Sequence, residues 1–232
     1  MKLQKKIVRN KNLSKFNSLK IGIKAKYYIE CKTDSDLEFA FHFLKKNKIK
    51  FFILGEGTNV VFTKPFEGLI IKNVFKKEKK IYGNKVKVSS GYNWDRFVSF
   101  CIKNSLYGLE NLSGIPGTVG AGPIQNIGAY GEEISNYIEH VEVFNFKTGN
   151  TEILNNKNCS FAYRNSFFKK NKHLFIKNIF FKLRENFIAN NSYQDLKVYK
   201  FKKASEIRKN ILKVRKQKLE NHLSRPNVGS FF

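Results

Sequence analysis

The sequence has few cysteines and few acidic residues, and it lacks any long apolar run. Its three cysteines, Cys31, Cys101 and Cys159, are widely spaced, form no CxxC pair and lie near no histidine cluster. These spacings fit neither a zinc site nor a disulfide framework. We therefore expect no bound metal and a reduced set of thiols, as in the cytoplasm.

The absence of long hydrophobic stretches argues against a membrane protein. No apolar run approaches the roughly 18 residues that a membrane-spanning helix needs. The basic N-terminal stretch is not followed by the hydrophobic segment of a secretory leader. We expect no membrane partner and a cytoplasmic protein.

Acidic residues are outnumbered by basic ones. The chain has 18 Asp and Glu against 44 Lys and Arg, a formal net charge of +26. Clustered cations would indicate nucleic-acid binding, because they neutralise phosphates and release counterions. Here the lysines are scattered through nearly every segment beside abundant Asn, Phe and Ile, as an A/T-rich coding sequence would produce. We expect no nucleic-acid partner and keep a basic nucleic-acid binder as an alternative.

Hydrophobic periodicity and turn residues predict a mixture of helices and hairpin strands. Thr33 followed by Asp36 is typical of a helix start, and the apolar spacing after it predicts a helix over 33–48. Asn93 is a candidate cap for a second helix that ends before Gly108. A last helix is predicted from about 205 to 219. Strands are predicted at 51–54, 60–62, 69–74, 81–88 as a hairpin, 140–154 as two strands, and 175–183. The predicted class is α+β.

Glycine is concentrated in one segment. Residues 108–131, GLENLSGIPGTVGAGPIQNIGAYG, hold seven of the fifteen glycines and two of the four prolines. Glycine lets backbone N–H groups approach a ligand closely, and successive N–H groups in turns bind anions such as a diphosphate. The spacing matches neither a dinucleotide GxGxxG motif nor a P-loop. A glycine-rich connecting loop without a ligand is the alternative.

The same segment resembles the hallmark of the UDP-N-acetylenolpyruvoylglucosamine reductases. Further motifs similar to those of this family occur in the family's order: LGEGTN at 54–59, CSFAYRNSFFK at 159–169, SYQDL at 192–196 and NVGSFF at 227–232. SYQDL resembles the longer-loop branch of the family. Several collinear motifs are far more specific than any one of them.

The resemblance implies a two-subdomain FAD-binding fold of the vanillyl-alcohol-oxidase (PCMH) type, with FAD between subdomains 1–75 and 76–219. The family's third, substrate-binding subdomain would begin at 220–232 and be missing beyond it. The residues that would contact FAD are Gly55, Glu56, Gly57, Thr58, Asn59, Ile115, Pro116, Gly117, Thr118, Gly120, Ala121, Gln125, Asn126, Gly128 and Ala129.

The resemblance also implies a reaction of cell-wall peptidoglycan synthesis. NADPH would reduce the flavin, which would pass hydride to the enolpyruvyl ether of a UDP-sugar. Arg164 matches the arginine that holds the substrate carboxylate, and a planar guanidinium suits the charge that develops there. Ser230 matches the serine that protonates the substrate carbon.

Four further residues match positions that contact the substrate. Tyr130 lies in the AYG triplet at the end of the glycine-rich segment, and Tyr193 belongs to the SYQDL motif. Arg215 and Lys218 lie three residues apart and so share a helix face, which by the resemblance would point toward NADPH or the UDP diphosphate. A solvated basic helix is the alternative for that pair.

The sequence departs from the family pattern at its end. The chain stops inside the GSFF motif, so we expect a truncated reading frame that lacks a catalytic glutamate of the missing subdomain. A flavin-binding remnant without turnover is therefore an alternative to the active reductase.

Overall fold

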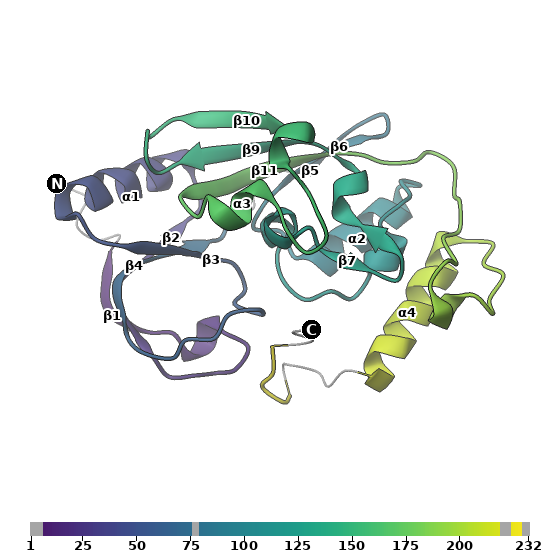
Figure 1. Cartoon of the computed structure of the whole chain (residues 1–232), viewed down its shortest axis with the longest axis horizontal. Coiled ribbons are helices and arrows are strands. Elements are labelled where there is room, and N and C mark those ends of the chain that lie inside the picture. Colours follow the sequence, from purple (N-terminus) through teal and green to yellow (C-terminus); the bar gives the residue numbers. More distant parts are fainter. Residues whose placement is uncertain (1–6, 76–78, 219–223, 229–232) are drawn as a thin grey trace.

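The computed structural model of the chain describes residues 7–75, 79–218 and 224–228. Figure 1 shows two main sheets lying one above the other, with α1 at one end between them and α4 at the opposite end of the molecule. Among the described residues, no helix combines the length and the apolar character needed to cross a membrane.

The smaller sheet contains four strands in the order β1-β2-β4-β3. Both β2 and β3 run parallel to β4, whereas β1 is antiparallel to β2. The central strand β4 is buried along most of its length, as expected of a parallel strand covered on both faces. The strands are β1 (Val8–Asn12), β2 (Lys24–Cys31), β3 (Phe51–Leu54) and β4 (Phe66–Asn73).

Helix α1 (Asp34–Asn47) fills the space between the two sheets. Its start is fixed by a capping box, in which Thr33 accepts from the Asp36 N–H and Asp36 accepts from the Thr33 N–H. The buried side of α1, with Leu37, belongs to one apolar cluster with residues of both sheets, among them Ile71 and Phe175. Burying this helix face holds the two sheets together.

The larger sheet has five antiparallel strands in the order β10-β9-β11-β6-β5. Helix α2 (Trp94–Lys103) and the glycine-rich segment belong to one core cluster with this sheet, in which Trp94 packs near Phe181. The strands are β5 (Lys79–Tyr82), β6 (Lys85–Ser89), β9 (Ile138–Asn145), β10 (Thr151–Asn155) and β11 (Leu174–Lys182). Shorter elements are β7 (Gly128–Ala129), β8 (Glu132–Glu133) and α3 (Phe167–Lys170).

Most predicted elements are confirmed, including the hairpin at 83–84 and the Asn93 cap of α2. The strand predicted at 60–62 is wrong, since these residues form no strand. Because β3 and β4 are parallel, the chain must run back along the sheet between them, and Phe62 packs on the sheet face during that return. Strands β1 and β2 were not predicted. The chain passes from the smaller sheet to the larger one between β4 and β5. The subdomain boundaries at 75–76 and 219–220 stay predictions.

Helix α4 (Ala204–Lys218) lies outside both sheets and is tied to α2 by a bidentate ion pair. The two guanidinium nitrogens of Arg208 lie 2.5 and 2.7 Å from the Asp95 carboxylate. Asp95 also accepts from the Gly114 N–H at 2.6 Å. Burial alone would raise the pKa of Asp95, but the hydrogen bonds from Arg208 and Gly114, with the charge of Arg208, lower it below its usual value.

We expect Asp95→Asn to lower the free energy of unfolding by about 1–3 kcal/mol at pH 7, because an ionised hydrogen-bond partner is lost. Because the folded-state pKa is lowered, this contribution is present above the unfolded aspartate pKa of about 3.9 and disappears as the pH falls through the folded value. Denaturant unfolding at pH 7, 4 and 3 measures it, with Glu185→Gln on the surface as the control. A difference from the parent chain that does not shrink in acid would contradict this role.

Candidate functional site

Two loops from different sheets face each other, and we call them the loop pair. The first, residues 55–59, follows β3 at the carboxyl end of the smaller sheet. The second, residues 115–121, belongs to the glycine-rich segment. Thr58 Oγ1 donates to the Pro116 carbonyl at 3.5 Å, and Asn59 Nδ2 donates to Gln125 Oε1 at 3.1 Å. The two glycine-rich segments that the sequence assigns to FAD contact therefore lie next to each other.

The carbonyl groups of the first loop are held from outside it. Lys72 Nζ donates to the Gly55 carbonyl, and the Ser18 N–H donates to the Gly57 carbonyl at 3.0 Å. In a trans peptide the C=O and the following N–H point in opposite directions. The N–H groups of Glu56 and Thr58 are consequently turned away from Lys72 and Ser18.

The second loop is held in the same way. Gly117 O accepts from the Trp94 N–H at 2.9 Å and from Asn93 Nδ2 at 3.5 Å, and Pro116 O accepts from Thr58. The bonds to Gly117 O turn the Thr118 N–H away from α2, and the bond from Thr58 to Pro116 O turns the Gly117 N–H away from the first loop. Among the described residues, none accepts a hydrogen bond from these two N–H groups or from those of Glu56 and Thr58.

The N–H groups of Glu56, Thr58 and Thr118 at this junction suit an anion, because backbone N–H groups in turns form concavities for phosphate. A further polar atom supports this interpretation. Thr118 Oγ1 is buried and has no hydrogen-bond partner. It lies 3.1 Å from the position that a Cβ on Gly55 would take, so the absence of a side chain there lets the loops approach. The residues present thus fit the diphosphate of a dinucleotide cofactor such as FAD.

A cavity of about 430 Å³ opens beside the first loop. Its other wall comes from the segment 14–20, which sequence reasoning did not assign to a site. Ser18 on this wall is buried, and its hydroxyl has no partner. No motif in the sequence marks this serine, which only the return of the chain from β1 to β2 brings to the loop. The cavity is lined by Ser14, Lys15, Asn17, Ser18, Lys20, Glu56 and Thr58.

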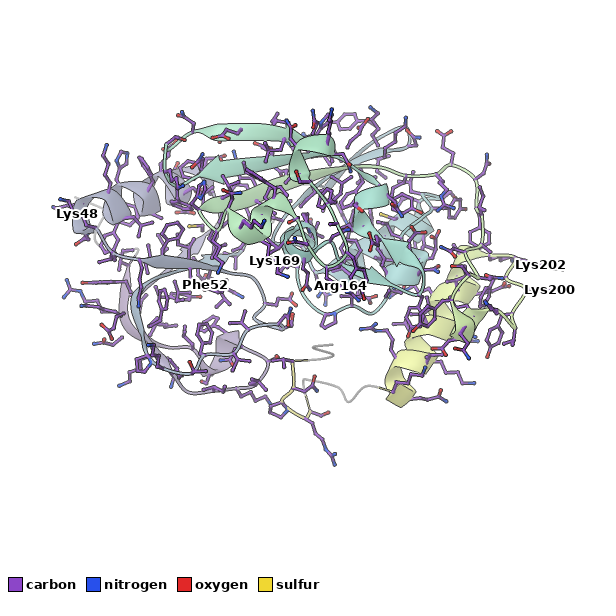
Figure 2. All side chains as sticks on the ribbon, in the orientation of Figure 1. Lys48, Phe52, Arg164, Lys169, Lys200 and Lys202 are labelled. Atoms are coloured by element: carbon purple, nitrogen blue, oxygen red, sulfur yellow. The ribbon has the colours of Figure 1, made fainter. Side chains whose placement is uncertain are left out.

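Arg164 lies on a turn that is fastened at both ends to the glycine-rich segment. The carbonyl of Ala162 accepts from Asn126 Nδ2 at 3.2 Å, and Ser166 Oγ donates to the Ile124 carbonyl at 2.7 Å. The side chain of Arg164 is exposed, and Figure 2 shows it beside Lys169, whose Nζ donates to the Arg164 carbonyl. Its φ of 50° is in the left-handed region, which a non-glycine residue adopts at a cost of order 1 kcal/mol or more.

Tyr130, Tyr193, Arg215 and Lys218 gather at α4, and we call them the α4 cluster. The rings of the two tyrosines lie 5.3 Å apart in an edge-on arrangement. Arg215 Nε donates to the Gly114 carbonyl at 3.1 Å, and its charge acts on the Tyr130 phenol. Lys218 Nζ lies 2.6 Å from Asp195. The structure therefore brings together all four residues that were predicted to contact the substrate.

Charge and burial perturb the ionisation of this cluster. Burial raises the pKa of Tyr130 and lowers that of Arg215, which nevertheless stays protonated at neutral pH. The hydrogen bond to Asp195 raises the pKa of Lys218. The cluster thus offers two cations and the neutral phenol of Tyr130 at pH 7, an arrangement that suits an anionic ligand.

The remaining predicted residues differ in what they contact. Ala121 and Gln125 lie at the loop pair, whereas Gly120 and Asn126 are engaged with the protein itself. The Gly120 N–H donates to Ser90, and the buried Asn126 side chain binds Glu133, Ala162 and Ser135. Ile115 packs against the core, and Gly128 and Ala129 form β7. Ser230 lies outside the described residues.

No group of three or more His, Cys, Asp or Glu side chains within 7–75, 79–218 and 224–228 is arranged to hold a metal ion.

Comparison with known proteins identifies the family. Residues 25–155 match a family described as FAD binding domain. The UDP-N-acetylenolpyruvoylglucosamine reductase of Buchnera aphidicola subsp. Baizongia pistaciae is 38% identical over 229 residues, which cover 95% of this chain and 68% of that protein. The chain belongs to the UDP-N-acetylenolpyruvoylglucosamine reductase family. The reductase-family protein of Polynucleobacter asymbioticus is 36% identical, with 98% of this chain and 68% of that protein covered.

Solved structures agree with this reductase-family fold. The crystal structure of UDP-N-acetylenolpyruvylglucosamine reductase from Thermus caldophilus has a TM-score of 0.70 at 21% identity, covering 96% of this chain and 72% of that one. The 6-hydroxy-D-nicotine oxidase of Arthrobacter nicotinovorans has a TM-score of 0.60 at 13% identity, covering 77% and 42%. The predicted α+β, FAD-binding fold class is confirmed.

Gly57 offers a test of the first loop. Its φ is +71°, and a Cβ there would lie 2.1 Å from the Phe16 carbonyl oxygen, a backbone atom. We expect Gly57→Ala to destabilise the chain by more than the roughly 1–2 kcal/mol of a left-handed alanine and to weaken FAD binding at least tenfold. Gly83→Ala is the matched control, since Gly83 has a φ of +58° with nothing within 4 Å of its Cβ position. Equal losses of stability and unchanged FAD affinity in both variants would contradict this role of the loop.

Proposed function

We propose that this chain binds FAD across the loop pair and takes part in the NADPH-dependent reduction of UDP-N-acetylglucosamine enolpyruvate to UDP-N-acetylmuramate, a step of peptidoglycan synthesis. The observation that carries the proposal is the junction of Glu56, Thr58 and Thr118, whose N–H groups have no acceptor among the described residues. Membership of the reductase family supports the choice of substrate. We place the reaction in the cytoplasm.

The loop pair would hold the FAD diphosphate through backbone N–H groups. A hydrogen bond to a charged acceptor contributes about 1.5–3 kcal/mol, and several such bonds add up to firm binding. Lys72 lies on the far side of the first loop, bound to the Gly55 carbonyl, where its charge favours an anion above the loop. Bound FAD would supply the hydride that reduces the vinyl group of the substrate.

Arg164 would grip the substrate carboxylate and stabilise the negative charge that develops as hydride arrives. A guanidinium can bind both carboxylate oxygens at once and keeps its charge at any working pH. Its turn is tied to residues 124–126 of the glycine-rich segment, so its position is set relative to the loop pair. We propose Ser230 as the proton donor to the substrate carbon.

The α4 cluster would bind the UDP end of the substrate. Arg215 and Lys218 carry two charges on one face of α4, and Tyr193, which is 46% exposed, can cover a ligand there. Phenol and cation side chains together suit a nucleoside diphosphate, because aromatic faces and charged donors recognise its two parts.

The first experiment is an absorbance spectrum of the purified chain with FAD, followed by NADPH oxidation with and without the enolpyruvyl substrate. Flavin binding with substrate-dependent NADPH oxidation is the expected result. A chain that binds flavin but shows no substrate-dependent turnover would be the flavin-binding remnant. Absence of FAD binding at micromolar concentrations would overturn the proposal.

Arg164→Met should lower kcat/KM about 100-fold or more, because the transition state loses its charge partner. FAD affinity should stay unchanged, since the guanidinium serves the substrate. Lys170→Met, at an exposed position of the neighbouring helix α3, is the control and should keep kcat/KM within about threefold. Equal effects of the two substitutions would show that Arg164 does not take part in the reaction.

Lys218→Met should raise KM for the UDP-sugar about tenfold, the size of one charge-assisted hydrogen bond, with little change in kcat. Lys216→Met removes the same charge from an exposed position of α4 and serves as the control. Steady-state kinetics at fixed ionic strength measures both. If the two substitutions raise KM equally, the effect comes from the overall positive charge of α4 and not from a contact between Lys218 and the substrate.

A further inference from the structure

Asn73 is a buried asparagine at the point where the chain leaves the smaller sheet. It is the last residue of β4, and the alternate residues Leu69 and Ile71 of that strand belong to the apolar cluster that joins the two sheets. Because successive side chains of a strand point to opposite faces, Asn73 continues this row and faces the larger sheet. The apolar row therefore ends in an amide that is only 6% exposed. A buried amide is unfavourable unless its hydrogen bonds are made.

The Asn73 side chain makes its hydrogen bonds across the junction of the two sheets. Its Nδ2 donates to Ser90 Oγ at 2.9 Å, and Ser90, which follows β6 of the larger sheet, is fully buried. Its Oδ1 accepts from the Phe75 N–H at 3.1 Å. The Phe75 carbonyl accepts from the Gly91 N–H at 2.7 Å, and a Cβ on Gly91 would lie 2.5 Å from the Phe75 nitrogen. The chain after β4 and the chain after β6 are thus in direct contact beside Asn73.

The residue that Asn73 binds supports the second loop of the loop pair. Ser90 O accepts from the Gly120 N–H at 2.8 Å, and a Cβ on Gly120 would lie 2.5 Å from the Ser90 Cβ, so the loop rests directly on Ser90. The residue before Asn73 supports the first loop, since Lys72 donates to the Gly55 carbonyl from the opposite face of the strand. Two consecutive residues of β4 therefore hold the two loops.

We propose that Asn73 is a positioning residue for the cofactor, which sets the position of the second loop relative to the first by acting through Ser90. This role rests on the proposed function, since the loops must hold FAD for their spacing to affect its binding. The donors proposed for the anion are the N–H groups of Glu56 and Thr58 on one loop and of Thr118 on the other. Hydrogen bonds weaken steeply as their angles depart from linearity, so a shift between the loops lowers the affinity for FAD.

Asn178 offers a matched control, because it makes the same kind of contact within the larger sheet. It is 7% exposed, its Oδ1 accepts from Ser89 Oγ at 2.9 Å, and its Nδ2 donates to Glu142 at 2.7 Å. Asn73 and Asn178 thus bind neighbouring buried serines, and each makes one further hydrogen bond. Of the two pairs, Asn73–Ser90 crosses between the sheets and Asn178–Ser89 does not.

The test compares Asn73→Ala with Asn178→Ala in the full chain. FAD affinity is measured by calorimetry, and the melting temperature is measured without ligand and at one fixed FAD concentration. Both variants should melt at similarly lowered temperatures without ligand, because each loses buried hydrogen bonds. FAD affinity should fall about tenfold in Asn73→Ala and stay within about twofold of the parent chain in Asn178→Ala. FAD should consequently raise the melting temperature of Asn73→Ala less than that of Asn178→Ala.

Ser90→Ala and Ser89→Ala repeat the comparison with smaller changes, and they decide it if an asparagine variant does not fold. Ser90→Ala should weaken FAD binding, and Ser89→Ala should not. The double variant Asn73→Ala, Ser90→Ala should bind FAD no more weakly than the weaker of the two single variants, because both residues act through one contact.

Other results would overturn this role of Asn73. If Asn73→Ala and Ser90→Ala both bind FAD as the parent chain does, the spacing of the loops does not depend on this contact, and the proposed function stands. Equal losses of FAD affinity in the Asn73 and Asn178 variants would assign the loss to general destabilisation. Losses that add in the double variant would show that Asn73 does not act through Ser90. If the parent chain binds no FAD, the proposed function fails and this role fails with it.

Discussion

The carbonyl groups of Gly55 and Gly57 are held by donors that come from β4 and from the β1–β2 connection, and the geometry of the loop pair depends on that restraint. Once Lys72 and the Ser18 N–H fix these oxygens, planar trans peptides turn the next N–H groups the other way. Position 57 requires glycine, because its φ is positive and the Phe16 backbone leaves no room for a side chain. The loop therefore presents donors before any ligand arrives, which reduces the ordering needed on binding.

The glycine-rich segment connects the two ends of the site. Near its start, Gly114 touches Asp95 and Arg215, and near its end Asn126 holds the turn that carries Arg164. Contacts at both ends tie the α4 cluster and the loop pair to one stretch of chain. In the proposed function, local hydrogen bonds in that stretch would fix the positions of cofactor and substrate relative to each other without any contact between the two ligands.

Sequence alone predicted the features that depend on near neighbours. The capping box at Thr33 and Asp36 and the Asn93 cap involve residues three apart, so their residue types are sufficient evidence. The family motifs also pointed to the loop pair and the α4 cluster. The strand at 60–62 was wrongly predicted because a short apolar run occurs both in strands and in connections that pack on a sheet. Ser18 and the Asp95–Arg208 pair, 113 residues apart, could not be found because only the folded chain creates them.

The ion pair between Lys218 and Asp195 has a consequence for which ligands α4 can select. Lys218 already holds a carboxylate at 2.6 Å, so an anion that approached it would meet the negative charge of Asp195. In the proposed function a ligand with one negative charge would gain little there, whereas a diphosphate would reach both Lys218 and Arg215 and outweigh that repulsion. The carboxylate would then act as an internal competitor and make the cluster discriminate between ligands by their number of charges.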